Sequence, residues 1–200
     1  MALLIEDYAL IGDTHGAALV GRNGSIDWWC APRYDSAACF AALLGDRNNG
    51  HWSISPVGAP LSSRRRYIPD TLVLETEWDV AGGTVRVIDH MPLREECCRV
   101  VRIIEGVSGT VDMEVELIIR FDYGHIVPWV RKIADGSLSA IGGPDSLNVR
   151  TPIRLRGEGL TSRANAQYPE PHTLPFGWVG GGGWDLVGRE LLLRDGDPDS

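Results

Sequence analysis

Apolar and polar residues alternate along much of this chain, and the alternation has a period of two. The clearest case runs from Val111 to Tyr123, where every second residue is apolar and most of the residues between are polar. A helix would spread such residues over all of its faces, whereas a strand places them on one face. The pattern therefore predicts a long strand with one buried face and one face that is largely exposed to water.

Glycine-rich breaks divide this pattern into hairpins. Asn23 and Gly24 tolerate the positive φ of a tight turn, so the apolar runs on either side of the Gly21 to Gly24 segment should pair. The predicted hairpins are 17–20 with 25–30, 71–80 with 84–89, and 99–105 with 110–123, and further strands are expected at 8–11, 51–55, 126–134, 137–141 and 147–156. Many antiparallel strands without an alternating strand–helix order predict an all-β protein, a two-sheet antiparallel β-sandwich.

One helix is expected beside the first hairpin. Pro32 cannot donate to a strand ladder, so the strand should end there and the segment from Pro32 to Ser36 should be a polar loop. Ser36 is a good N-cap for a short helix at 37–44, and Gly45 is a typical stop. This loop, held between a strand and a capped helix, is the best-defined place for function in the sequence.

Several short motifs follow one another along the chain. They are Ile5-Glu-Asp-Tyr-Ala-Leu-Ile-Gly12, Ala18-Leu-Val20, Gly24-Ser-Ile-Asp-Trp28, Pro32-Arg-Tyr-Asp-Ser36, Phe40-Ala-Ala-Leu-Leu44, Arg65-Arg-Tyr67, Thr71-Leu-Val-Leu-Glu-Thr76, Val87-Ile-Asp89 with Met91-Pro92, and Arg120-Phe-Asp-Tyr-Gly124. In this order they resemble the opening of bacterial trehalases and glucoamylase-like enzymes of glycoside hydrolase family 15. Together they cover roughly residues 5 to 160, which makes the resemblance more specific than any single motif.

The resemblance implies a non-catalytic N-terminal β-sandwich, of the supersandwich kind, that precedes an (α/α)6 barrel. In that family the barrel carries two catalytic glutamates, so this chain alone should be inactive and its expected partners are the barrel and an α-glucoside. Glycoside hydrolysis needs a placed pair of carboxyl groups, and no pair in this chain stands out from the acidic residues on solvent faces. Candidates for the active-site rim or for contact with the barrel are Asp27, Trp28, Pro32, Arg33, Tyr34, Asp35 and Ser36.

The same loop also has a purely structural interpretation. Trp28 and Trp29 would then alternate, one toward the core and one outward, while Arg33 and Asp35 pair with each other and Ser36 caps the helix. Alternatively, exposed tryptophans at positions 28, 129 or 178 would favour a free-standing carbohydrate-binding sandwich.

Composition narrows the possible partners and the compartment. The net charge of -8 disfavours binding to nucleic acid or to an anionic membrane surface, and no apolar run is long enough to span a membrane. Of the four cysteines, Cys97 and Cys98 are adjacent and would close only a strained ring. The chain begins without a signal-peptide pattern, so we expect a reducing cytoplasm. No cofactor and no zinc site is expected, because the cysteines lack the usual ligand spacing.

Asp13 and His15 raise one remote alternative. The segment Gly12-Asp-Thr-His-Gly16 looks like the first metal-binding motif of calcineurin-like metallophosphatases. The later ligand blocks and the alternating strand–helix pattern of that fold are missing, so a turn that places Asp13 for its geometry is the simpler interpretation. His90 and His125 are isolated histidines at strand ends and are expected to be structural or exposed.

The last part of the chain has a different character. From about Ala164, prolines and a glycine run break any strand or helix pattern, so we expect a β-sandwich domain at 1–163 and a poorly ordered tail at 164–200. Such a tail would arise from truncation or a change of reading frame. In the alternative, the chain is a genuine short protein in which Trp178 and Trp184 dock on the sandwich. A domain that lacks its large partner could also self-associate through an apolar face.

Overall fold

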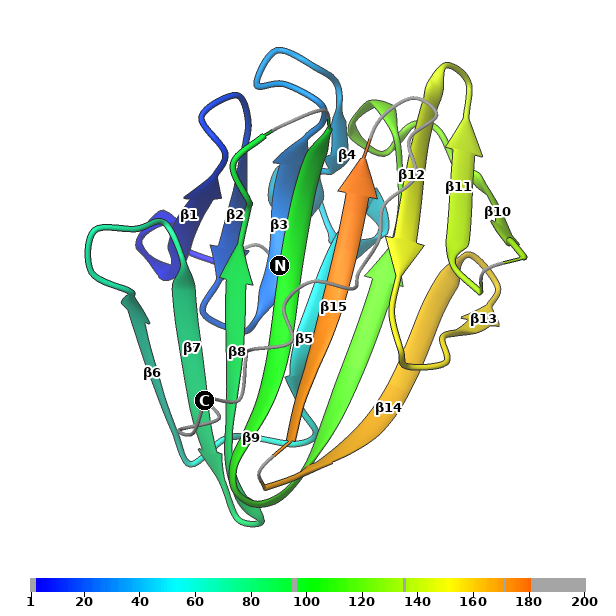
Figure 1. The fold of residues 1–200 in the computed structure, drawn as a ribbon. Coiled ribbons are helices and arrows are strands. Elements are labelled where there is room, and N and C mark those ends of the chain that lie inside the picture. The colour runs from blue at the N-terminus through cyan, green and yellow to red at the C-terminus, as the bar shows by residue number, and fades with distance from the viewer. Residues whose placement is uncertain (1–2, 95–96, 135, 171, 181–200) are drawn as a thin grey trace, which may run out of the picture.

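A computed structural model describes residues 3–94, 97–134, 136–170 and 172–180, and Figure 1 shows their arrangement as two antiparallel sheets packed face to face. The first sheet has the order β1-β2-β3-β5-β9-β14-β13, with β4 beside β3, and the second has the order β6-β7-β8-β9-β15-β12-β11-β10. The strands are β1 Tyr8–Gly12, β2 Ala17–Gly21, β3 Ser25–Cys30, β4 Ala38–Phe40, β5 His51–Pro56, β6 Ser62–Tyr67, β7 Leu74–Val80, β8 Gly83–His90, β9 Cys98–Ile118, β10 Trp129–Lys132, β11 Leu138–Gly142, β12 Asp145–Arg150, β13 Arg156–Glu158, β14 Thr161–Pro169 and β15 His172–Gly180. The all-β sandwich expected from the alternation is confirmed.

The first two predicted hairpins are present. Strands β2 and β3 pair antiparallel, and Gly24, at φ +78°, closes their turn with a hydrogen bond to the carbonyl of Gly21 at 2.9 Å. A side chain at Gly24 would also meet the carbonyl oxygen of Ile54, so only glycine fits this position. Strands β7 and β8 pair in the same way around Gly82 and Gly83.

The third predicted hairpin is wrong, because residues 98–118 form one strand, β9. Its first half pairs with β8 and β15 in the second sheet, and its second half pairs with β5 and β14 in the first sheet. The segment Gly106 to Gly109 is the bend between the halves, and Gly109 has φ +63°. The glycines allow close approach of neighbouring backbone instead of a reversal, since a side chain at Gly106 would lie 2.5 Å from the carbonyl oxygen of Pro169.

The helix expected at 37–44 is also wrong. Ala38–Phe40 form the short strand β4, which pairs with the end of β3, and only the 3-10 turn η2, Ala42–Leu44, follows it before Gly45. All three residues of β4 are buried, and the ring of Phe40 lies 6.0 Å from that of Trp29. Burial of consecutive side chains beside β3 outweighs the weak helical preference of this segment. The described helical turns are all of the 3-10 type: η1 Ile5–Asp7, η2, η3 Arg47–Asn49 and η4 Asp122–Gly124.

Strand structure continues past Ala164, contrary to the expectation for that segment. β14 and β15 run side by side with the two halves of β9, and the chain passes from one to the other near Glu170, beside the bend of β9. Residues 164–169 and 172–180 are therefore part of the sandwich, although prolines obscure their strand pattern. Residues 181–200, which include Trp184, lie outside the described part.

The core lies between the two sheets and is built from the inward face of each strand. Its largest fully buried side chains include Trp29, Trp52, Phe40 and Tyr168. Arg102 of β9 is buried among them and donates hydrogen bonds of 2.7 Å to the carbonyl oxygens of Trp52 and Gly24. A cation thus links the second sheet to the first. Within the described residues, no helix has the length and apolar character needed to cross a membrane.

Candidate functional site

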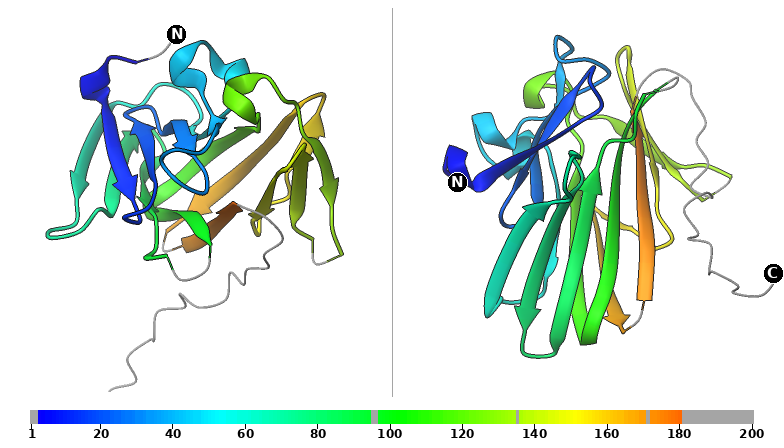
Figure 2. Two further views of the ribbon diagram at one scale, coloured as in Figure 1. Left: turned by 90° about the horizontal axis from the view of Figure 1, so that it is seen from above. Right: turned by 60° about the vertical axis from the view of Figure 1, so that its left-hand side comes forward.

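The loops that carry most of the predicted site residues lie together at one end of the sandwich. Strand β1 ends there at Gly12, β3 ends there at Cys30, and β5 begins there at His51, so the connections after and before these strands meet (Figure 1). Seen from above, the β3–β4 loop, η3 and η4 gather at this end (Figure 2). We call this end the loop cluster and define it as residues 13–16, 31–37, 42–50 and 121–128.

The Pro32 to Ser36 loop is a compact exposed turn. The amide of Arg33 donates to Ser36 Oγ at 3.1 Å, and the amide of Ser36 donates to the carbonyl of Arg33 at 3.1 Å. The amide of Tyr34 donates to the carbonyl of His15 at 3.2 Å, which joins this loop to the 13–16 turn. Ser36 therefore closes its own loop and caps no helix. Tyr34 is 61% exposed and projects from the turn.

Arg33 and Asp35 pair with each other, as the structural interpretation of the loop expects. Arg33 Nε lies 2.8 Å from Asp35 Oδ1, and both side chains are exposed. The hydrogen bond from Arg33 lowers the pKa of the Asp35 carboxyl, and the same contact raises the pKa of Arg33. Asp35 is thus an ionised acceptor, and it does not have the raised pKa that a general acid needs at neutral pH.

The two tryptophans of β3 also alternate as that interpretation expects. Trp29 is fully buried, whereas Trp28 is half-buried and its ring lies 6.0 Å from that of Tyr123. Trp28 thereby joins Tyr123 of the loop cluster in a small aromatic pair.

Tyr123 has an unusual backbone that the sequence did not reveal. Asp122, Tyr123 and Gly124 have φ values of +50°, +56° and +105°, so three consecutive residues of η4 lie in the left-handed region. A bulky residue is rare there, and such a conformation persists only where surrounding contacts hold it. Asn49 of η3 provides one contact, since its Nδ2 donates to the carbonyl of Tyr123 at 3.4 Å. In the sequence, only the glycine at position 124, which follows Asp122 and Tyr123, signals a turn with positive φ at this place.

Asp27, which was grouped with the Pro32 to Ser36 loop as a candidate for the active-site rim, lies within β3 and not in that loop. Its carboxylate is buried and accepts hydrogen bonds from Tyr8 Oη at 2.7 Å and from Ser25 Oγ at 2.5 Å. Burial, together with the hydrogen bond from Tyr8 to Asp27, raises the pKa of Tyr8 to about 12. Asp27 therefore ties β1 to β3, and its carboxylate is occupied by these two hydroxyl groups.

Asp13 organises the turn that follows β1. Its Oδ1 accepts from the amides of His15 and Gly16 at 3.0 and 2.8 Å, and its Oδ2 accepts from Arg94 Nε at 2.9 Å. The carboxylate is buried, while His15 is exposed and its Nδ1 lies 3.3 Å from Thr14 Oγ1. Across the described ranges, no group of three or more His, Cys, Asp or Glu side chains could hold a metal ion. The geometry of Asp13 is that of a structural turn.

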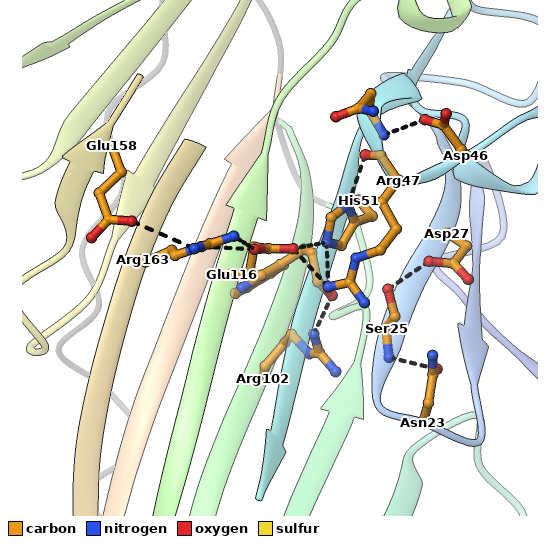
Figure 3. A network of polar contacts seen from close by, with 12 residues as sticks. Asn23, Ser25, Asp27, Asp46, Arg47, His51, Arg102, Glu116, Glu158 and Arg163 are labelled. Carbon is orange, nitrogen blue, oxygen red and sulfur yellow. Dashed lines mark hydrogen bonds and ion pairs between the residues drawn. The ribbon is translucent and has the colours of Figure 1, made fainter. Parts of the chain in front are cut away.

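A second polar network, which sequence reasoning missed, lies across β5, β9 and β14 (Figure 3). Glu116 is at its centre and accepts hydrogen bonds from Arg47 Nη2 at 2.7 Å and from Arg163 Nε at 2.8 Å. His51 Nε2 lies 3.0 Å from the same carboxylate, and His51 Nδ1 lies 2.9 Å from the carbonyl of Arg47. The partners of Glu116 lie 47 to 69 residues away from it along the chain. Only Arg47 and His51 are near each other in the sequence, so no local pattern marks the network.

The charges of this network fit a structural role. Burial alone would raise the pKa of Glu116, but the hydrogen bonds from Arg47 and Arg163 lower it below its usual value. Burial lowers the pKa of His51, whose side chain is fully buried. Glu116 is therefore an ionised acceptor held by two cations, and it lacks the protonated state of a glycosidase acid.

Comparison with known proteins places these features in a family. The sequence model described as "Trehalase-like, N-terminal" matches residues 1–169. A trehalase from Mycobacterium tuberculosis is 31% identical over 192 residues, which cover 83% of this chain and 28% of that protein. "Trehalase 1" from Sulfolobus acidocaldarius is 35% identical over 132 residues, 66% of this chain and 22% of that protein. A trehalase from Thermoplasma volcanium is 31% identical over 158 residues, 76% of this chain and 25% of that protein.

The chain belongs to the trehalase-like N-terminal domain family. It spans less than a third of the length of these relatives. The family match reaches Pro169, the last residue of β14, so it includes residues beyond the boundary expected at 163.

Proposed function

We propose that this chain is the non-catalytic N-terminal domain of a glycoside hydrolase that acts on trehalose or another α-glucoside. The observation that carries the proposal is the family match over residues 1–169 in a chain that covers only 28% of a trehalase. In this proposal the rest of such an enzyme, an (α/α)6 barrel, supplies the acid and the base. The carboxylates of Asp13, Asp35 and Glu116 support it, because each is bonded to an arginine and none has the environment of a proton donor.

The loop cluster is the surface that we assign to the catalytic part and to the rim of its sugar site. Tyr34 is 61% exposed and Leu44 is 64% exposed, and large side chains of this kind favour burial against a partner. Arg33 offers further guanidinium N–H groups beyond its bond to Asp35, and these suit a sugar hydroxyl or a carboxylate of the barrel. Asp27, Trp28, Pro32 and Ser36 would support this surface from β3 and from the loop.

The experiment compares three preparations for glucose release from trehalose and from maltooligosaccharides. They are this chain alone, the catalytic part of a relative alone, and the two joined. We expect no release by this chain alone, and higher activity or solubility of the catalytic part when the chain is joined to it. Turnover by the isolated chain would contradict the proposal, and so would a catalytic part whose activity and solubility do not change on joining.

A free-standing carbohydrate-binding sandwich is the second candidate, and Trp129 favours it. This residue of the edge strand β10 is 65% exposed, and the guanidinium of Arg131 lies 5.6 Å from the ring centre. An exposed ring beside a hydrogen-bond donor suits one face of a sugar. Sugar binding that Trp129→Ala abolishes, in a chain that does not affect catalysis by the barrel, would favour this candidate.

The compartment and the oligomeric state belong to the same proposal. Cys30, Cys39, Cys97 and Cys98 are all free and buried, which suits a reducing cytoplasm. Without the catalytic part, the exposed loop cluster would be available for self-association, which sedimentation of the isolated chain would detect.

A further inference from the structure

A cavity of about 390 Å³ opens at the seam between the two sheets, at the end of β3 opposite the loop cluster. Its walls come from the β2–β3 turn at Arg22 and Asn23, the end of β5 at Ser55, β6 at Ser63 and β7 at Trp78. This volume falls within the range of small-molecule sites, about 300–1,000 Å³. None of the predicted site residues lines it.

The walls of this cavity are held by contacts between the sheets. Arg65 of β6 donates from Nη1 to the carbonyls of Asp7 at 2.9 Å and Val20 at 3.2 Å, so it fastens the edge of the second sheet to the first. A side chain at Gly24 would lie 3.0 Å from Trp78 Cη2, so the bare glycine lets the indole pack against the β2–β3 turn. A preformed cavity of this kind requires little ordering when a ligand binds.

The polar groups of the cavity are uncharged or paired. The hydroxyl groups of Ser55, which is half-buried, and Ser63, which is exposed, make no hydrogen bond to another described residue. Asn23 accepts from the amide of Ser25 at 3.2 Å through Oδ1, which leaves its Nδ2 as a donor. The two charged groups, Asp7 and Arg22, form an ion pair of 3.2 Å and cancel each other.

The apolar part of the lining complements these groups. Trp78 is only 3% exposed and presents an edge to the cavity, while Pro56 and Pro60 add apolar carbon atoms to its walls. Hydroxyl and amide groups set among aromatic and proline carbons, without net charge, suit a molecule that carries many hydroxyl groups on an apolar ring. A phosphate or carboxylate would find no unpaired cation here.

We propose that this cavity binds a small uncharged saccharide, of mono- or disaccharide size. Asn23, Ser55 and Ser63 hydrogen-bond its hydroxyl groups, and Pro60 and the accessible edge of Trp78 contact its carbon atoms. The site is remote from the loop cluster, so it does not depend on whether that surface meets a catalytic barrel.

Saturation-transfer NMR on the 200-residue chain tests the site, with glucose, trehalose and maltose as separate probes. Ser63→Trp fills the cavity from an exposed position of β6, and Ser55→Val removes one hydroxyl group with little change in volume. Ser146→Trp, on β12 across the second sheet, is the matched control. We expect at least one sugar to show transfer in the wild-type chain and in Ser146→Trp, and none to do so in Ser63→Trp. Ser55→Val should bind about three- to tenfold more weakly, as the loss of a neutral hydrogen bond implies.

Three results would overturn the proposal. The first is absence of transfer with all three sugars, and the second is transfer that persists in Ser63→Trp. The third is transfer that Trp129→Ala abolishes, since that variant leaves the cavity intact and would place the sugar on β10. Glucose 6-phosphate serves as a charge control, because tighter binding of the phosphorylated sugar would contradict an uncharged site. Circular dichroism and thermal unfolding of each variant establish that it is folded.

Discussion

Arg102 and Asp89 form an ion pair in the centre of the sandwich, with 2.7 Å between Arg102 Nε and Asp89 Oδ1 and 3.3 Å between Nη2 and Oδ2. Both side chains are excluded from water, and the guanidinium also lies 5.0 Å from the ring centre of Trp52. A buried charge is tolerated only where it is paired and hydrogen-bonded. Since Arg102 also reaches two carbonyls of the first sheet, this one side chain couples the ion pair to the packing of the sheets.

Removal of Arg102 should therefore be strongly destabilising. We expect Arg102→Met to lower the free energy of unfolding by about 3–5 kcal/mol, because Asp89 is left charged and unpaired in the core. Urea unfolding followed by tryptophan fluorescence measures the change. Arg22→Met breaks the exposed pair with Asp7 and should cost no more than about 1 kcal/mol. Equal effects of the two substitutions would contradict the role given to Arg102.

Gly106 tests the bend of β9. A Cβ at this position would lie 2.5 Å from the carbonyl oxygen of Pro169, so Gly106→Ala should lower the free energy of unfolding by roughly 1–3 kcal/mol through overpacking. Gly157→Ala is the matched control, because its Cβ would meet no atom within 4 Å. If Gly106→Ala is as stable as Gly157→Ala, β9 does not follow the course described.

The buried histidines predict a loss of stability in mild acid. Burial lowers the pKa values of His51 and His90 below the ordinary value of 6.5. The unfolded chain then binds protons that the folded chain does not, so stability is fully present above pH 6.5 and falls as the pH drops through the folded values. The slope is at most about 1.4 kcal/mol per pH unit for each proton taken up.

Denaturant midpoints between pH 7.5 and pH 5 measure this slope. His51→Gln should reduce the slope, whereas His125→Gln should not, because His125 is largely exposed. A profile that is flat over this range would contradict the prediction. The carboxylates with lowered pKa values, such as Glu116, act in the same direction but at lower pH, so the two effects are separable.

The cysteines should be protected in the folded chain. All four are buried, and burial raises the pKa of Cys98 to about 11 and that of Cys39 well above its ordinary value. Since the thiolate is the reactive form, we expect slow reaction with a disulfide reagent at neutral pH and rapid reaction of all four thiols in urea. Fast reaction of these thiols in the absence of urea would contradict the prediction, because it would show that the core around the cysteines opens readily.

Arg33 tests the loop cluster in a longer relative. Arg33→Ala at the matching position should leave thermal stability unchanged, because the Arg33–Asp35 pair is exposed. It should lower kcat/KM for trehalose or an α-glucan by about tenfold or more, since a charge-assisted hydrogen bond is lost. Arg66→Ala on β6 is the matched control, because it removes another exposed arginine that pairs with a carboxylate. An unchanged kcat/KM would remove Arg33 from the rim.

Local signals in the sequence were sufficient for part of the fold. Asn23 and Gly24 mark the first hairpin because a tight turn needs their backbone freedom, and the alternation from Val111 onward marks the second half of β9 because one of its faces is buried. The same kind of signal failed at Gly106 to Gly109, since glycine serves a bend with close backbone contacts as well as it serves a reversal. At Ala38–Phe40, burial beside β3 decided the structure, and burial is not a local property.

The candidate site was predictable to a similar extent. The loop at Pro32 to Ser36 follows from proline chemistry, and strand alternation predicts that one of Trp28 and Trp29 points inward and the other outward. Tyr123 joins Trp28 only through the left-handed turn of η4, and Glu116 gathers partners from η3, β5 and β14. Contacts between residues so far apart in the chain depend on the completed fold, so no single stretch of sequence carries them.

The shared strand β9 also has a consequence for synthesis. Each half of β9 pairs on one side with a strand made earlier, β5 or β8, and on the other side with a strand made later, β14 or β15. A nascent chain that has reached Ile118 therefore still presents one open edge along the whole length of β9. That edge is covered only when residues up to Gly180 have left the ribosome, so until then it is open to pairing with another chain.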